Sequence, residues 1–161
     1  MTTMAPSAQD YADQFAALNS NVMEIVRACA NDDWAAPCQD EGWPVGVVAH
    51  HIATIYPDFS GLLEAFLRDE TRSPSSSMAD VDLANAQHAH DYLAVGQATT
   101  LEALSSGGAA LTSAILRLGN ERLAAPAGVF GDRALTVAQV VEWVVIGHTQ
   151  LHYESIVATL A

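Results

Sequence analysis

The sequence contains no lysine, and its six arginines face nineteen acidic residues, so the formal net charge is -13. Phosphate backbones and anionic membrane surfaces select basic partners. No stretch approaches the ~18 uninterrupted apolar residues of a membrane-spanning helix. The richest run, residues 137–146, is broken by Gln139 and Glu142. We therefore expect neither nucleic-acid binding nor membrane association.

The sequence also has few cysteines and no recognisable leader signal. Cys29 and Cys38 are the two cysteines, too far apart in the chain for a CxxC redox or zinc motif. The first basic residue is Arg27, so the N-terminus lacks the basic segment of a secretory signal or transit peptide. These features predict a cytoplasmic protein whose thiols stay reduced and form no disulfide framework.

Charged residues make up 16% of the chain and hydrophobic residues 50%, which excludes a disordered polypeptide. A length of 161 residues suits one domain, predicted to span residues 1–161. Alternation typical of strands is almost missing, with Val129-Phe130 between two glycines as the one candidate. We therefore expect an all-α protein without significant β-sheet.

Apolar residues recur instead at spacings of three and four, which mark helical faces. They predict four long helices, over residues 7–30, 44–72, 99–118 and 136–156. Residues 81–92 are more polar and are expected to be part helix and part loop, and the serine-rich residues 73–77 to form a loop. Four helices of this kind predict a four-helix bundle.

Local signals refine the helix ends. Thr99 with Glu102, and Thr136 with Gln139, have the spacing of capping boxes at helix N-termini. Pro57 lies inside the second helix and predicts a kink or break there. Gly107-Gly108 lies within the third helix, which is tolerated where another backbone packs closely.

Two histidines in the last predicted helix carry the first chemical signal. His148 and His152 are four residues apart, so they share one helical face, and they continue the apolar stripe of Val141 and Val144. They are expected to point into the bundle as metal ligands or as hydrogen-bonded core histidines. Thr149 follows His148 where a zincin protease needs glutamate, which excludes that class.

A third histidine lies on the second predicted helix. His51 occupies an interior-facing position, and three neutral imidazoles with one open position are typical of catalytic zinc. His50 is rotated by about 100° from His51 and is expected at the rim or surface rather than as a ligand. His88 and His90 are spaced by two and are expected to be solvated.

These motifs resemble a known family. The stretch Glu41–Ala53 resembles the Gly-Trp-(Ser/Thr)-Val…His signature of the DinB-like metal-binding bundles, and His148–His152 resembles their C-terminal His-x-x-x-His. Asp82 and Asn85 extend the resemblance, which covers nearly the whole chain. Pro44 replaces the usual serine or threonine. The resemblance is closest to the N-terminal domain of mycothiol-dependent maleylpyruvate isomerase.

The resemblance implies that His51, His148 and His152 bind a divalent metal, with zinc expected first and nickel or iron as alternatives. It also implies a thiol-dependent S-transferase or isomerase that uses a low-molecular-weight thiol such as mycothiol on a small electrophile. Because the isomerase carries a further C-terminal domain, its own reaction does not transfer directly. An apolar helix face left outside the bundle would suit a homodimer.

Two other functions stay open. One is a non-catalytic bundle that binds a metal or a small molecule, and the other is a metal-dependent hydrolase. A hydrolase needs a general base, but Glu142 and Glu154 are rotated away from the histidines. Asp58 lies on nearly the same face as His51, about 10 Å along the helix, and could line the cavity.

Aromatic residues and one cysteine flank the predicted ligands in the sequence. Trp43, Tyr56 and Tyr153 are interpreted either as pocket walls or as ordinary packing. Cys38 precedes Trp43 and is expected to be a buried, inert thiol.

Overall fold

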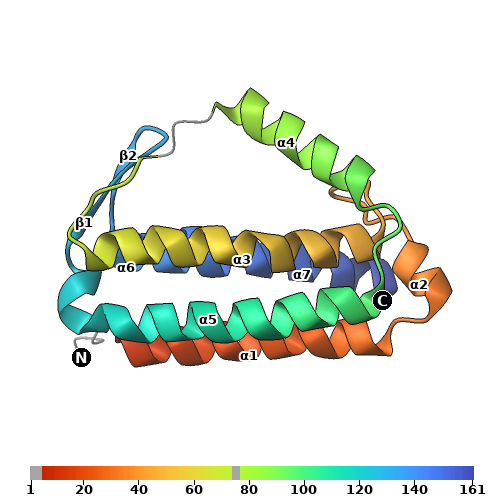
Figure 1. Cartoon of the computed structure of the whole chain (residues 1–161), viewed down its shortest axis with the longest axis horizontal. Helices are drawn as coiled ribbons and strands as arrows, with labels where there is room; N and C mark the ends of the chain where they lie inside the picture. Colours follow the sequence, from red (N-terminus) through yellow and green to blue (C-terminus); the bar gives the residue numbers. More distant parts are fainter. Residues whose placement is uncertain (1–4, 74–76) are drawn as a thin grey trace.

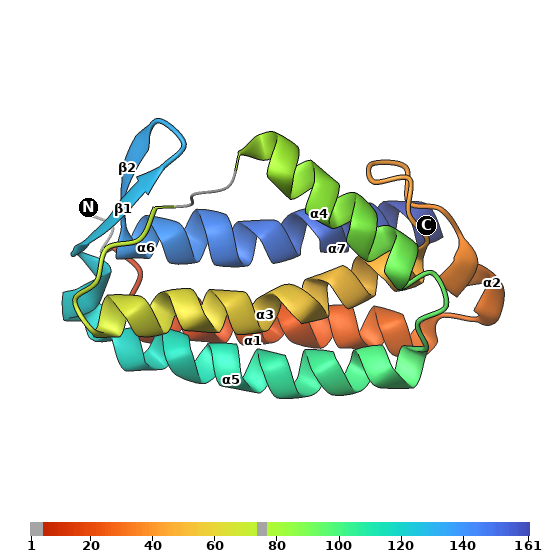
Figure 2. The ribbon, with the colours of Figure 1, turned by 45° about the horizontal axis from the view of Figure 1, so that its top comes forward.

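The computed structural model describes residues 5–73 and 77–161. Four long helical segments lie side by side (Figures 1 and 2). They are α1 (Ala8–Ala28), α3 (Val45–Leu67), α5 (Gln97–Leu123) and a last segment made of α6 (Val137–Gln139), the π-helical η1 (Val140–Ile146) and α7 (Gly147–Leu160). The predicted all-α four-helix bundle is confirmed.

Shorter elements connect the long helices. They are α2 (Asn31–Ala35), α4 (Met78–Asp91) and an antiparallel hairpin of β1 (Pro126–Phe130) and β2 (Arg133–Thr136). The hairpin contains the one strand candidate of the sequence. In the described ranges, no helix is long and apolar enough to cross a membrane.

Helix α1 forms where the sequence predicts it. Ser7 and Asp10 make a reciprocal capping box at its start, and Arg27 lies in its last turn, where a cation stabilises the helix dipole. Its apolar residues at helical spacing are buried in the core: Tyr11, Phe15, Leu18, Val22 and Val26.

Helix α3 is the central element of the site. All residues from Val45 to Ala53 are buried. Pro57 lies inside the helix but is exposed, and the helix continues to Leu67, so a break at Pro57 does not occur and the helix ends earlier than predicted. Figure 2 shows the axis of α3 bending along its length.

The two predicted capping boxes have different outcomes. Thr136 and Gln139 form the predicted box at the start of α6. The Thr99–Glu102 box is wrong, because α5 begins at Gln97 with Gly96 as its N-cap and no side-chain cap. The Gln97 amide instead donates to the carbonyls of Val26 and Cys29, at 2.9 and 2.8 Å, and so joins the start of α5 to the end of α1.

The glycine pair in α5 packs closely against α3 and α1. A Cβ on Gly107 would lie 3.3 Å from Cβ of Tyr56 and 3.8 Å from the backbone oxygen of Ala53, so a neighbouring backbone lies close, as expected. A Cβ on Gly108 would lie 2.1 Å from Nδ2 of the buried Asn19. Asn19 donates to the Leu104 carbonyl at 3.0 Å and accepts from the Tyr56 hydroxyl at 3.0 Å. One amide therefore links α1, α3 and α5, and Gly108 leaves space for it.

Helix α4 is a complete helix, where a mixture of helix and loop was predicted. Ser77 and Asp80 form its capping box, and Ala89 is its one buried residue. Figures 1 and 2 show α4 standing apart from the four packed helices along most of its length. Of the predicted serine-rich loop, residues 74–76 lie outside the described ranges.

We expect Gly108→Ala to destabilise the protein by about 1–3 kcal/mol, because the new methyl group displaces Asn19 and leaves buried polar groups without partners. Urea denaturation measures this loss. Gly61→Ala in α3 is the matched control, since a Cβ there meets nothing within 4 Å. It should stabilise by about 0.5–1 kcal/mol. Equal stability of the two variants would contradict the role of Asn19.

Candidate metal centre

A change of helical register precedes the C-terminal histidine pair. The π-helix η1 covers Val140–Ile146, and π-helical turns occur frequently at functional sites. Val145, in the last turn of η1, and Thr149 are buried, whereas Val144, His148 and His152 are partly exposed. Both histidines nevertheless face His51 of α3, as expected. They lie on the flank of the buried stripe.

The structure brings the three predicted histidines together. Nε2 of His51, from the second turn of α3, lies 3.2 Å from Nε2 of His148 on α7. The ring centroid of His152 is 5.0 Å from that of His51 and 4.6 Å from that of His148. One ring nitrogen from each residue lies within 4.8 Å of the others. This spacing could hold one metal ion.

Burial keeps two of these rings neutral. Loss of solvation, reinforced by the nearby His152, lowers the pKa of His51 from 6.5 to about 4. The same cause lowers the pKa of His148 to about 3. At neutral pH both rings therefore keep a free lone pair, which is the form that binds metals. The donor chemistry fits a divalent cation.

Glu41 is a site residue that the sequence analysis does not identify. Its carboxylate accepts from Nδ1 of His152 at 2.7 Å and from the Ser155 hydroxyl at 2.6 Å. Because Nδ1 of His152 is hydrogen-bonded to Glu41, Nε2 is the ring nitrogen that remains to act as a ligand together with the other histidines. A carboxylate behind a histidine fixes its tautomer and orientation, as in many metal sites.

The loop between α2 and α3 positions Glu41. Cys38 N–H donates to the Trp43 carbonyl at 2.8 Å, and Gly42 N–H donates to the Cys38 carbonyl at 2.8 Å. Gly42 has φ +72°, which favours glycine. Helical periodicity carries no information about such a loop. The one sequence feature that could have identified Glu41 is its position directly before Gly42-Trp43, in the stretch that resembles the family signature.

A second pair of histidines lies beside the cluster. Nδ1 of His50 is 3.4 Å from Nε2 of His88, and the Tyr92 ring lies tilted against the His50 ring with centroids 4.3 Å apart. His50 is buried and His88 is half-buried, so the surface position considered for His50 and the solvated state expected for His88 are both wrong. The cause is tertiary, because α4 lays His88 against the start of α3. His90 is exposed, as predicted.

The flanking aromatic residues differ in position. Trp43 packs edge-on against His51, with centroids 5.8 Å apart. Tyr56 is a core residue, and Tyr153 packs against the core while partly buried, so both agree with the packing interpretation. Cys38 is fully buried, and burial raises the pKa of its thiol, as expected for an inert cysteine.

Glu142 and Glu154, which were considered as general bases, lie away from the histidines, as expected. Glu142 accepts from the Tyr11 hydroxyl at 3.4 Å, and Glu154 accepts from Gln150 at 2.6 Å. Neither lines the cavity beside the histidines, whereas Asp58 does.

That cavity of about 880 Å³ has the three histidines in its wall. Residues of α3, α4, η1 and α7 line it, and α4 contributes Val81 and Asn85. Asp82, which was grouped with Asn85 in the resemblance, is exposed and lies outside the lining. The cavity is large enough for a small-molecule ligand.

The buried histidines make the stability of the metal-free protein depend on pH. In the unfolded chain both titrate near pKa 6.5, but in the folded protein the pKa of His51 is about 4 and that of His148 about 3. Between these values the unfolded state binds more protons. The free energy of unfolding should therefore fall as the pH falls from 6.5 toward 4. Urea denaturation over this range measures the slope.

His148→Gln removes one titrating ring and should make this slope shallower. His90→Gln, at an exposed position, is the control and should keep the wild-type slope. The same pH dependence in His148→Gln as in the wild type would show that burial of His148 does not cause the effect.

Comparison with known proteins supplies the family. The model of the mycothiol maleylpyruvate isomerase N-terminal domain matches residues 15–150, which include His51 and His148. No curated protein and no solved structure matches the chain. The match spans most of the sequence and agrees with the helical bundle and its histidine cluster. The chain belongs to the family of the mycothiol maleylpyruvate isomerase N-terminal domain, which is DinB-like.

Proposed function

We propose that His51, His148 and His152 bind one divalent metal ion, and that the protein uses this ion to activate a low-molecular-weight thiol, such as mycothiol, for transfer to a small electrophile. Zinc is the first expectation, with nickel or iron as alternatives. The observation that supports this proposal is the convergence of three ring nitrogens within 4.8 Å at the wall of a cavity.

The donor set suits activation of a nucleophile. Three neutral imidazoles add no negative charge, so a bound ion would keep its full positive charge and lower the pKa of a thiol in an open position. Among the described residues the cluster has these three members. A structural site is closed by a fourth protein ligand, so a three-residue cluster beside a cavity favours the catalytic type.

Neighbouring residues hold the histidines in place. Glu41 orients His152. Trp43 packs edge-on against His51, and Phe59 packs edge-on against His148 with centroids 5.5 Å apart. These contacts restrict rotation of the histidine rings. The cavity leaves room for the thiol and its acceptor.

A hydrolytic reaction has less support. It needs a base that is free to take a proton from water. Both oxygens of Glu41 already accept hydrogen bonds, from His152 and Ser155. Asp58 lines the cavity but lies about 10 Å along α3 from His51. Thiol activation needs no such base, because the cation itself favours the thiolate.

The decisive experiment is metal content by mass spectrometry on protein purified without an affinity tag. We expect one divalent ion per chain in the wild type and none in His148→Ala/His152→Ala. His90→Ala is the matched control and should keep the metal, since His90 is exposed and outside the cluster. Equal metal content in the wild type and the double variant would overturn the proposed site.

The thiol step has a separate measurement. Metal-loaded wild-type protein should bind mycothiol with release of about one proton per thiol, because coordination favours the thiolate. Calorimetry in buffers of different ionisation enthalpy counts the protons. Thiol binding with no proton release would contradict activation by the metal and leave a binding protein.

Glu41→Ala should lower metal affinity by about 10- to 100-fold, because His152 loses the carboxylate that orients it. Competition with a chromophoric chelator measures the affinity. Asp40→Ala removes an exposed carboxylate from the adjacent position and should leave affinity unchanged. Equal loss in both variants would indicate a general charge effect instead of an oriented hydrogen bond.

A further inference from the structure

A second pocket continues the histidine cavity along the bundle. This pocket, of about 440 Å³, lies between α3, η1 and the hairpin. Asp58, Phe59 and Val144 line both spaces, so the two form one groove. His51 and Leu62 mark its ends on α3, and their 11-residue separation corresponds to about 16 Å at ~1.5 Å per residue.

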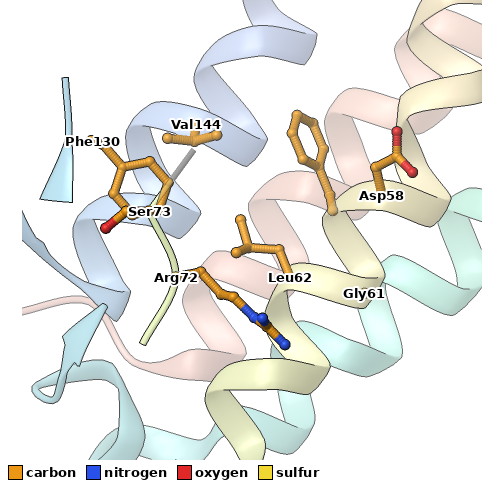
Figure 3. A pocket seen from close by; sticks show the side chains of 8 residues that line it. Asp58, Gly61, Leu62, Arg72, Ser73, Phe130 and Val144 are labelled. Atoms are coloured by element: carbon orange, nitrogen blue, oxygen red, sulfur yellow. The ribbon is translucent and has the colours of Figure 1, made fainter. Parts of the chain in front are cut away.

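The walls of this second pocket are mainly apolar. Figure 3 shows Leu62 of α3, Val144 of η1 and Phe130 of the hairpin around it. Phe59 joins the two halves, since its ring also packs against His148 with centroids 5.5 Å apart. A ligand that reaches the histidines can therefore extend along the groove and bury apolar surface.

The hairpin lies at the far end of the groove, where hydrogen bonds attach it to the segment after α3. Arg72 N–H donates to the Ala127 carbonyl at 2.7 Å, and Val129 N–H donates to the Ser73 hydroxyl at 3.0 Å. At Gly128, with φ +137°, a Cβ would lie 1.9 Å from the Arg72 carbonyl oxygen. The close approach requires glycine, and it places Phe130 of the same strand at the pocket.

The charges around the groove disfavour an anionic ligand. Arg72 is the cation in the lining of the second pocket, and Glu70 already engages its guanidinium. Asp58, midway along the groove, adds an exposed carboxylate. The net charge of the chain is -13. These charges favour an uncharged group over an anion in the groove.

We propose that the groove between α3 and η1 binds an uncharged, apolar arm of the substrate, an alkyl chain or a single aromatic ring, whose reactive end lies at the three histidines. This inference rests on the proposed function only for the histidine end. It assigns the acceptor class as elongated apolar electrophiles, in preference to compact polar ones.

The test uses straight-chain alkyl hydroxamates, from acetohydroxamate to octanohydroxamate, because the head group binds metals while the chain length varies. Calorimetric titration of zinc-loaded wild-type protein should show affinity rising about three- to fourfold per added methylene until the groove is filled. Affinity that does not depend on chain length would overturn the proposal.

A matched pair of variants places the effect in the groove. Gly61 lines the second pocket, and a Cβ there meets nothing within 4 Å, so a side chain can be introduced without a clash at its Cβ. Gly61→Phe should stop the gain in affinity beyond short chains and leave acetohydroxamate binding unchanged. Gly61→Ala should keep most of the gain. The same rise in Gly61→Phe as in the wild type would show that the chain binds elsewhere.

Failure of the proposed metal site can be distinguished from failure of the groove. If acetohydroxamate does not bind to the wild type and no metal is present, the proposed function fails. The groove is then tested on metal-free protein by NMR titration, which measures the binding of 1-butanol and of 1-octanol. Tighter binding of 1-octanol that Gly61→Phe abolishes supports the groove, and equal binding to wild type and Gly61→Phe refutes it.

Discussion

The packing of the start of α3 against α7 is the constraint on which the rest of the site depends. Complete burial of residues Val45 to Ala53 fixes the second turn of α3 within the bundle, and with it His51. The α7 helix then places His148 with its Nε2 3.2 Å away. Because the same packing removes solvent from both rings, it also lowers the pKa of each. Position and protonation state therefore have one cause.

Two irregular elements adapt a regular bundle to this site. The π-helix η1 changes the register before His148, so the histidine pair lies at the flank of the buried stripe and borders a cavity. The loop before α3 turns at Gly42 and presents Glu41 to His152. The four helices supply rigidity, and these departures from regular structure supply access and orientation.

The elements outside the bundle shape the space in front of the histidines. Helix α4 contributes Val81 and Asn85 to the cavity and lays His88 against His50. The hairpin, joined to the segment after α3 through Arg72 and Ala127, ends the groove with Phe130. The bundle therefore fixes the three histidines, while its connections shape the space beside them.

The sequence by itself determined the four helices and the identity of the three clustered histidines, because helical periodicity and i, i+4 spacing are local properties of the chain. Only the tertiary structure decided the role of Glu41, the burial of His50 and the start of α5 at Gln97, since each depends on contacts between distant segments. It also decided the groove, whose walls come from α3, η1 and the hairpin. Cavities form between elements, and no single segment encodes the distance to its neighbours.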